Sequence, residues 1–148
     1  TVVPTLAVTH ANMQSRVEEG VPEHLIRKAK EDYPHMIESF KKVCQSGVRM
    51  ALGTDTIGHI PWLKHGDNAI ELEHMVNYGM SEMDAILCAT KNASECLGLQ
   101  DRIGTIEEGK LADIIVVDGN PLRRISVLRE RRNIHLVMKD GRVFFRRG

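Results

Sequence analysis

The sequence has few aromatic residues and few cysteines, and it carries no net charge at neutral pH. Aromatic residues make up 4% of its 148 residues, three residues are cysteine, and Lys plus Arg equals Asp plus Glu at 20 each. The cysteines, at positions 44, 88 and 96, fit neither a disulfide framework nor a Cys-x-x-Cys metal pattern, so we expect a reducing, cytoplasmic setting. Zero net charge excludes the overall basic footprint of a nucleic-acid-binding protein, and no such partner is expected.

Long apolar runs are missing as well. A membrane-spanning helix needs about 18 or more consecutive apolar residues, and no stretch approaches this, so no membrane partner is expected. The composition that remains is that of a globular protein, 42% hydrophobic and 27% charged, in a length that suits one domain of usual size. Arginines concentrate after residue 122, where a solvated helix face and tail is favoured over a polyanion-binding arm.

The first half of the chain has the pattern of a strand–helix–strand crossover. Residues 1–6 are β-branched and apolar, whereas residues 7–20 are polar and have no clear period. From Pro22 to Gly47, apolar residues recur every three or four positions, which predicts one helix that Pro34 should split or kink. The run 48–52 then predicts a buried strand parallel to the first.

Further helical patterns follow, and after residue 98 the pattern becomes strand-like. Helices are predicted around 70–78, 81–90 and 93–97, and His74 is interpreted as a helix surface residue. Residues 112–118 predict a strand. Two more apolar runs, 134–138 and 143–145, flank an Asp-Gly pair, which is a strong hairpin signal. We therefore expect an α/β part at residues 1–98 and a β part at residues 99–148.

A lone carboxylate follows the predicted strand at 48–52. Gly53 allows a close backbone approach, and side chains at the C-terminal ends of barrel strands are the ones that meet substrate. Asp55 is therefore a candidate metal ligand or general base. The same Gly-Thr-Asp-Thr tetrapeptide also suits an ordinary turn, so the motif alone leaves both interpretations open.

Several blocks of the sequence together resemble the C-terminal part of a metal-dependent amidohydrolase. The most specific is 103–121, and the others are 53–55, 65–72, 89–95, 97–99 and 137–143. They stand in the family's order and cover nearly all of the chain from Val48 onward. Their details are closest to the imidazolonepropionase-like branch, which includes dipeptidases acting on Xaa-Pro or Xaa-Arg.

The resemblance implies both a fold and an activity. The fold would be the C-terminal fragment of a (β/α)8 TIM barrel, its last two strands with their helices, plus strands of a small β-sandwich domain. The activity would be hydrolysis of an amide or peptide bond in a dipeptide or cyclic amide, by water activated on one or two zinc ions. In this family Asp55 matches the strand-eight aspartate, which binds metal and takes a proton from the water.

Other parts of the family pattern have no counterpart in this sequence. It contains no His-x-His pair, so the remaining zinc ligands are expected on a missing N-terminal part of the same protein. The chain alone is therefore predicted to be inactive, and its exposed apolar surface would favour a homo-oligomer. His65, His10 and His59 are candidate substrate contacts, and Trp62 is a candidate for the pocket mouth. The alternative is a non-catalytic interaction or scaffold module that uses the basic residues of 123–132.

Overall fold

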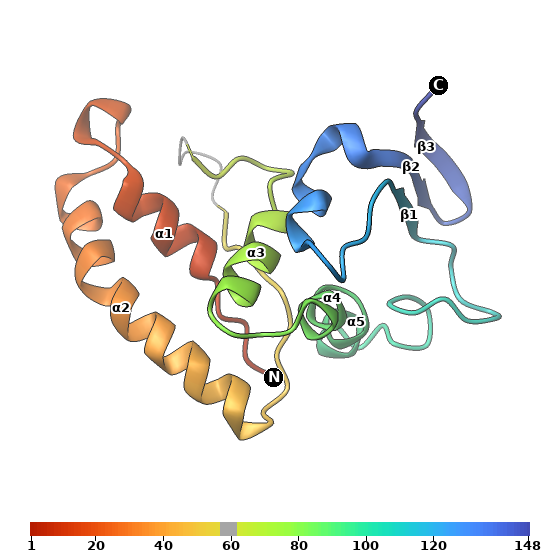
Figure 1. Cartoon of the computed structure of the whole chain (residues 1–148), viewed down its shortest axis with the longest axis horizontal. Coiled ribbons are helices and arrows are strands. Elements are labelled where there is room, and N and C mark those ends of the chain that lie inside the picture. Colours follow the sequence, from red (N-terminus) through yellow and green to blue (C-terminus); the bar gives the residue numbers. More distant parts are fainter. Residues whose placement is uncertain (57–61) are drawn as a thin grey trace.

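The computed structural model describes residues 1–56 and 62–148. The α-helices all lie before residue 97, with a long connection between α2 and α3, and a small sheet follows (Figure 1). The helices are α1 Leu6–Gln14, α2 Glu23–Ser46, α3 Ala69–Asn77, α4 Glu82–Ala89 and α5 Lys91–Cys96. The 3-10 turns are η1 Val17–Glu19, η2 Ile125–Arg129 and η3 Arg131–Asn133, and the strands are β1 Ile114–Val117, β2 Ile134–Lys139 and β3 Arg142–Arg146.

The predicted crossover is present in a reduced form. A single parallel bridge joins Val2 to Met50, so the direction of the two segments is as expected. The Val2 N–H donates to the carbonyl of Arg49, and the Ala51 N–H donates to the carbonyl of Val2, both at 2.9 Å. Neither 1–6 nor 48–52 forms a full strand, and this part of the prediction is wrong.

The far edge of the segment 49–52 explains part of this difference. The N–H of Leu52 donates to the carbonyl of Cys88 in α4 at 2.9 Å. The side-chain amide of Asn92 in α5 donates to the carbonyl of Met50, also at 2.9 Å. Helices α4 and α5 therefore occupy backbone groups that a neighbouring strand would use in a wider sheet.

Helix α1 lies where the sequence pattern predicts irregular structure. Its periodicity is weak because its buried residues are limited to Leu6, Ala7 and Ala11. The residue at its N-cap, Thr5, is in the left-handed conformation with φ 49° and makes no side-chain capping hydrogen bond. The carboxylate of Glu71, far along the chain, accepts from the first two amides instead. A cap supplied from so distant a residue leaves no local signature.

Helix α2 is a single helix that contains Pro34, so the predicted split is wrong, and a kink at this position stays a prediction. Proline removes one N–H, which here would have bonded the carbonyl of Lys30. Both residues are exposed, so water can satisfy that carbonyl. Buried side chains on both sides of the proline, Tyr33 before it and Phe40 after it, pack into the same core. The helix ends at Gly47, with φ 70°, as predicted.

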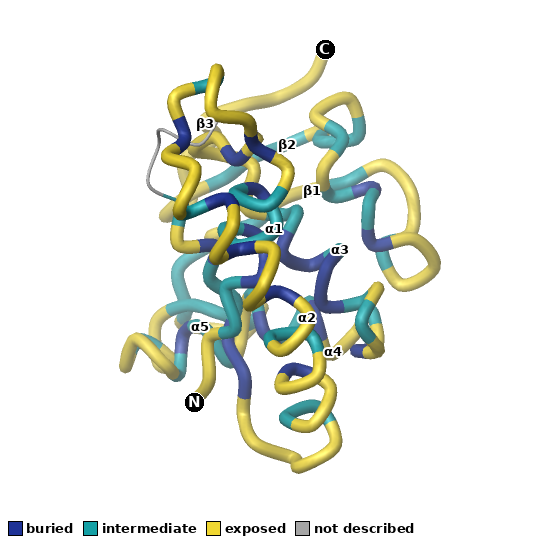
Figure 2. The backbone as a smooth tube through the Cα atoms, turned by 90° about the vertical axis from the view of Figure 1, so that its left-hand side faces the viewer, coloured by how far each residue is buried: buried dark blue, intermediate teal, exposed yellow. Residues whose placement is uncertain are grey.

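The main core lies among α1, α2, α3 and α4, and η2 adds to it from the C-terminal part (Figure 2). Helix α3 occupies the middle of this arrangement and packs against α1, α4 and η2 (Figure 1). The Ser81 side chain caps α4, as the sequence predicts, by accepting the N–H of Asp84 at 3.1 Å. In residues 1–56 and 62–148, no helix is long and apolar enough to cross a membrane.

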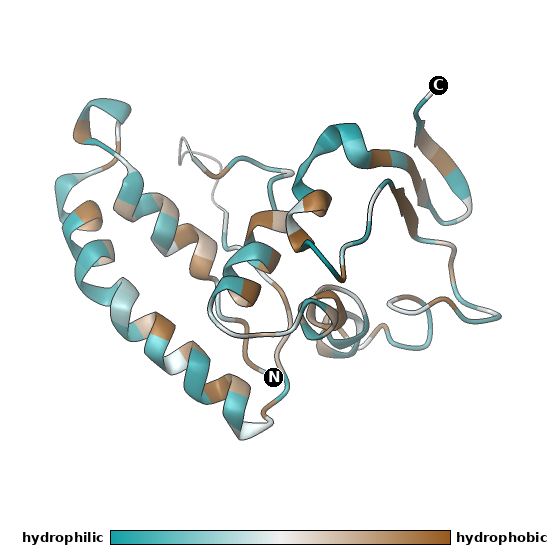
Figure 3. Ribbon diagram, viewed as in Figure 1, coloured by the Kyte–Doolittle hydropathy of each residue, from teal (hydrophilic) through white to brown (hydrophobic). Residues whose placement is uncertain are grey.

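The sheet has the order β1-β2-β3 and is antiparallel throughout. The predicted hairpin between β2 and β3 is confirmed. Asp140 and Gly141 both have positive φ, of 49° and 72°, as a type I′ turn requires. Apolar side chains of β1 and β3 remain in contact with solvent, and Figure 3 shows both strands as hydrophobic. The most exposed among them is Phe144, at 67%.

Candidate functional site

Asp55 directly follows the segment that is bridged to Val2. Its side chain is exposed, and its backbone has the left-handed φ of 51°. Such a conformation is uncommon outside glycine, although aspartate adopts it more readily than most residues. Because the segments 1–4 and 49–52 run parallel, the corner at Asp55 and the start of α1 leave the pair at the same end.

The two residues before Asp55 are tightly placed. A Cβ on Gly53 would lie 2.6 Å from Cγ1 of Val3, so glycine is needed for the two segments to approach this closely. Thr54 is buried, and its hydroxyl donates to the side-chain oxygen of Asn68 at 3.2 Å. Asn68 is the N-cap residue of α3, so this helix holds the corner from one side.

Glu71, in the first turn of α3, is a buried carboxylate that the sequence does not single out. It has no solvent exposure. Its Oε1 accepts the N–H of Leu6 at 2.9 Å, and its Oε2 accepts the N–H of Ala7 at 2.7 Å. Burial raises the pKa of Glu71 to about 7, and the two amide hydrogen bonds oppose that rise. The only sequence signal is a charged residue between the apolar Ile70 and Leu72.

His10 lies on α1 within a cluster of four rings. Its ring centroid is 4.5 Å from that of His74 and 5.4 Å from that of Tyr33, and Tyr78 completes the group. The hydroxyls of the two tyrosines are hydrogen-bonded at 3.1 Å, and the Nε2 atoms of His10 and Gln14 are 3.3 Å apart. Burial lowers the pKa of His10. His10 is therefore part of a packed aromatic cluster.

The prediction that His74 lies on a helix surface is wrong. His74 is 7% exposed, because α3 is central and turns this histidine toward His10 on α1. Within the described part of the chain, its Nε2 has no hydrogen-bond partner. Desolvation, helped by the nearby His10, lowers the pKa of His74 to about 4. The imidazole is therefore neutral at physiological pH.

The other candidate contacts lie on the loop after Asp55. His65 is exposed, in a turn closed by a hydrogen bond of 3.1 Å from the Lys64 N–H to the Asp67 carboxylate. His59 falls outside the described residues. Trp62 is half exposed, and its indole N–H donates to the Glu19 carboxylate at 3.2 Å.

The residues present do not by themselves fit a complete zinc site. Across residues 1–56 and 62–148, no three His, Cys, Asp or Glu side chains gather closely enough to hold a metal ion. Catalytic zinc takes about three protein ligands. The candidate ligand Asp55 therefore does not belong to a ligand set among the described residues, and it forms no ion pair with any described side chain.

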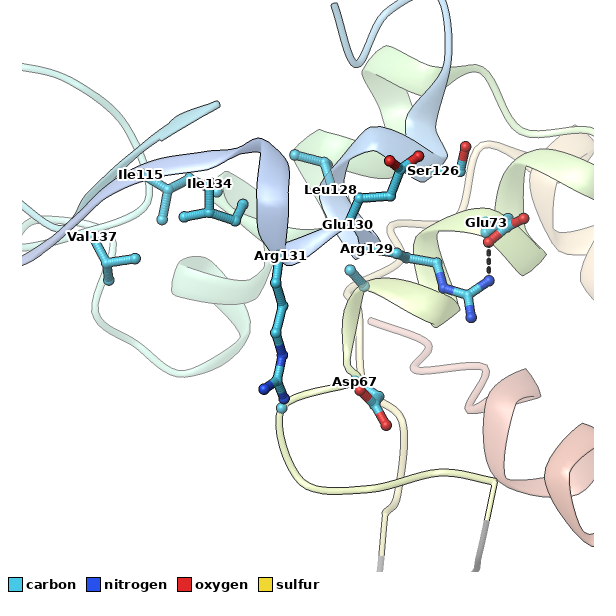
Figure 4. Close-up of a pocket in the computed structure, with 12 residues that line it drawn as sticks. Asp67, Glu73, Ile115, Ser126, Leu128, Arg129, Glu130, Arg131, Ile134 and Val137 are labelled. Atoms are coloured by element: carbon cyan, nitrogen blue, oxygen red, sulfur yellow. Dashed lines mark hydrogen bonds and ion pairs between the residues drawn. The ribbon is translucent and has the colours of Figure 1, made fainter. Parts of the chain in front are cut away.

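A cleft of about 560 Å³ lies between the start of α3 and the sheet (Figure 4). Its walls carry both signs of charge, and Arg129 is ion-paired there with Glu73. The apolar part comes from Ile115, Ile134 and Val137. Asp55 is not among the lining residues. A second groove of about 460 Å³ lies between residues 2–6 and α2.

Comparison with known proteins places the chain in one family. The sequence profile of the Amidohydrolase family matches residues 2–144. Ochratoxinase of Aspergillus niger is 36% identical over 110 residues, which are 73% of this chain and 22% of that protein. Imidazolonepropionase of Thermoplasma volcanium is 33% identical over 104 residues, 69% of this chain and 25% of that protein.

The fold agrees with these matches. A crystal structure of a Xaa-Pro dipeptidase with bound methionine in the active site superposes with a TM-score of 0.81 and 37% identity. That superposition covers 96% of this chain and 34% of the dipeptidase chain, so the chain spans about a third of its length. The profile match and the identities together show that this chain belongs to the amidohydrolase family.

Proposed function

We propose that the chain is the C-terminal part of a metal-dependent hydrolase that cleaves an amide or peptide bond in a small substrate. A dipeptide or a cyclic amide is the favoured class. The names of the related proteins, a Xaa-Pro dipeptidase and an imidazolonepropionase, support this class of substrate. In this proposal the N-terminal part of the same protein supplies the ligands that this chain lacks and completes a centre of one or two zinc ions.

The position of Asp55 carries the proposal. Its carboxylate leaves the end of a buried, parallel-bridged segment, is exposed, and is held by a corner that Gly53 and Thr54 fix. In α/β barrels this end of the strands is where substrates are bound. A zinc ion there would lower the pKa of a bound water to about 7. The role of this chain is to hold the Asp55 carboxylate where it can accept the proton from that water.

Exposed apolar side chains support the proposal that an N-terminal part belongs to this protein. The apolar side chains of β1 and β3 lie open to solvent, and so does Val2 on the bridged segment. In a complete family member these surfaces would pack against the rest of the barrel and the sandwich. An N-terminal segment would thus cover apolar area as well as supply metal ligands.

No observation favours the alternative of a basic interaction module. Of the arginines between 123 and 132, Arg124 and Arg132 pair with Glu130, at 3.3 Å and 2.7 Å, and Arg129 pairs with Glu73. These two carboxylates offset part of the positive charge of the arginines that a polyanion-binding surface would use.

The first experiment separates this chain from the whole protein. The purified 148-residue chain with added zinc is tested on a panel of Xaa-Pro and Xaa-Arg dipeptides and cyclic amides. We expect no turnover, because the chain does not hold a full ligand set. The product of the full-length gene should hydrolyse at least one member of the panel. Sustained turnover by the short chain, or none by the longer protein loaded with metal, would contradict the proposal.

The second experiment tests Asp55 in the full-length protein. Asp55→Asn should lower kcat by about a hundredfold or more, because the amide cannot accept a proton. Asp140→Asn is a matched control, since Asp140 is also exposed and also has a positive φ, of 49°. Asparagine tolerates this conformation well, so neither change should disturb folding. Equal activity of the two variants would remove Asp55 from the site.

A further inference from the structure

We propose that Glu71 is a positioning residue, which fixes the start of α1 relative to the Asp55 corner through hydrogen bonds made by one helix, α3. The inference rests on the proposed function, because it concerns the geometry around Asp55. The comparisons assign no role to this carboxylate. It touches two backbone amides and no substrate-facing group, so its effect is on structure around the site and not on a chemical step.

The contact with α1 replaces a missing cap. The first amides of a helix have no partner within the helix, and a side chain at the N-cap usually satisfies them. Here Thr5 has φ 49°, an unusual conformation for a β-branched residue, and makes no capping hydrogen bond. Glu71 accepts from both Leu6 and Ala7, so both its oxygens are engaged at the positive end of the helix dipole.

Burial makes this contact specific. Glu71, Leu6 and Ala7 are each at most 1% exposed, so water cannot replace the carboxylate as the acceptor. No ion pair to Glu71 exists among the described residues, and the two amides are its recorded hydrogen-bond donors. Loss of the carboxylate would leave two buried amides without partners, which strongly disfavours the present position of α1.

Helix α3 also holds the Asp55 corner. Asn68, three residues before Glu71, accepts the hydroxyl of Thr54, the residue that precedes Asp55. The parallel bridge brings the start of α1 and the Asp55 corner to the same end of the paired segments. The first turn of α3 thus contacts both connections that leave this end. A shift of that turn would move both, and displacements of about 1 Å at a reacting group can cost a hundredfold in rate.

Amide hydrogen exchange in the 148-residue chain tests the two hydrogen bonds to Glu71 without reference to activity. In Glu71→Gln the side-chain NH2 must face one of the two amides, so exchange at that amide, Leu6 or Ala7, should accelerate at least tenfold. Glu73→Gln is the matched control, because Glu73 lies on the same helix and pairs with Arg129. It should leave both amides protected. Unchanged protection in folded Glu71→Gln would overturn the contact.

Kinetics of the full-length hydrolase test the consequence for the site. Glu71→Gln should lower kcat tenfold to a hundredfold with a smaller change in KM and no loss of bound metal, whereas Glu73→Gln should leave kcat unchanged. Accelerated exchange at Leu6 or Ala7 with wild-type kcat would overturn the positioning role. Wild-type kcat in Asp55→Asn would instead reject the proposed function, while the exchange result would still stand for the contact itself.

A milder variant covers the case in which Glu71→Gln does not fold. Thr54→Val keeps the shape of the side chain and removes the hydroxyl that reaches Asn68. It should lower kcat about tenfold, while Leu6 and Ala7 stay protected from amide exchange. Wild-type kcat in this variant would contradict the proposal that α3 positions the corner.

Discussion

Two buried titratable residues of α3 respond to pH in opposite directions. Burial raises the pKa of Glu71 from 4.5 to about 7, so its contribution to stability is present below pH 4.5 and is lost as the pH rises through 7. Desolvation lowers the pKa of His74 from 6.5 to about 4. Its contribution is present above pH 6.5 and is lost as the pH falls through 4. Each shift corresponds to about 3 kcal/mol at most.

We expect His74→Leu to expose the contribution of Glu71. The substitution removes the unpaired Nε2 and the group that must stay neutral. The Tm of this variant should rise when the pH is lowered from 7.5 to 5, whereas the wild type should change little. Burial also lowers the pKa of His10. His10 therefore also contributes stability that is lost at acid pH, and this smaller loss remains in His74→Leu. Thermal unfolding followed by circular dichroism at several pH values measures this.

Glu71→Gln should show the opposite behaviour. Without the carboxyl group, no proton is taken up on folding near pH 6, and the histidine contribution remains alone. The Tm should then fall as the pH is lowered from 6.5 to 4.5, more steeply than in the wild type. Glu73→Gln, whose parent side chain is partly exposed in an ion pair, should follow the wild-type profile. Parallel profiles for Glu71→Gln and wild type would show that the carboxyl titrates near its ordinary value.

Among the helices, α2 carries a removable defect. Pro34 lies inside the helix and is exposed, and the carbonyl of Lys30 has lost its helical donor. Pro34→Ala restores that hydrogen bond and relieves the steric conflict, so it should stabilise the chain by about 1–3 kcal/mol. Urea denaturation measures the difference. Ser39→Ala, at another exposed position of α2, is a control that should change stability by much less. A loss of stability in Pro34→Ala would mean that the core requires the geometry imposed by proline.

Elements with local signals could be predicted from the sequence. Gly47 ends α2, Ser81 begins α4, and Asp140 with Gly141 turns the hairpin, because each acts within a few residues of itself. Helix α1 could not be predicted in this way. Its N-terminal amides depend on Glu71, which is 64 residues from Ala7, so the decisive hydrogen bonds are invisible to any short window.

In the candidate site, too, some features follow from the local sequence and others depend on how distant segments pack. The position of Asp55 after a buried apolar run is a local pattern, and its place at the end of the bridged segment follows from it. The burial of His74 and the contact between Thr54 and Asn68 depend on where α3 packs, which periodicity does not determine. The role of Asp55 as a metal ligand stays a prediction, because the other ligands would come from outside this chain.

For the whole molecule, the open sheet predicts self-association of the isolated chain. Phe144 and Phe145 of β3 are 67% and 46% exposed, and the outer edge of that strand has no partner among the described residues. Exposed edges with apolar side chains tend to pair with other chains. Arg142 and Arg146 flank the apolar residues, so their mutual repulsion should weaken association at low salt. Sedimentation velocity across a range of concentrations should therefore show oligomers that increase with added salt.

Phe144→Lys should reduce this association by several-fold. The change adds a charge at the centre of the exposed strand, and charged side chains at an edge oppose pairing. Ile106→Lys serves as the control, since Ile106 is 86% exposed but lies outside the sheet. Equal association of the two variants would place the contact elsewhere on the surface.

Both edges of segment 49–52 are hydrogen-bonded within this chain, and this limits where the protein can be divided by engineering. One edge bonds Val2, and the other is engaged by Cys88 and Asn92. In the proposed full-length protein, the N-terminal part would meet this chain along the exposed residues 1–3 and along the open sheet. A strand that entered beside Met50 would first have to displace the Asn92 side chain. Junctions for split or permuted versions are best kept away from residues 88–92.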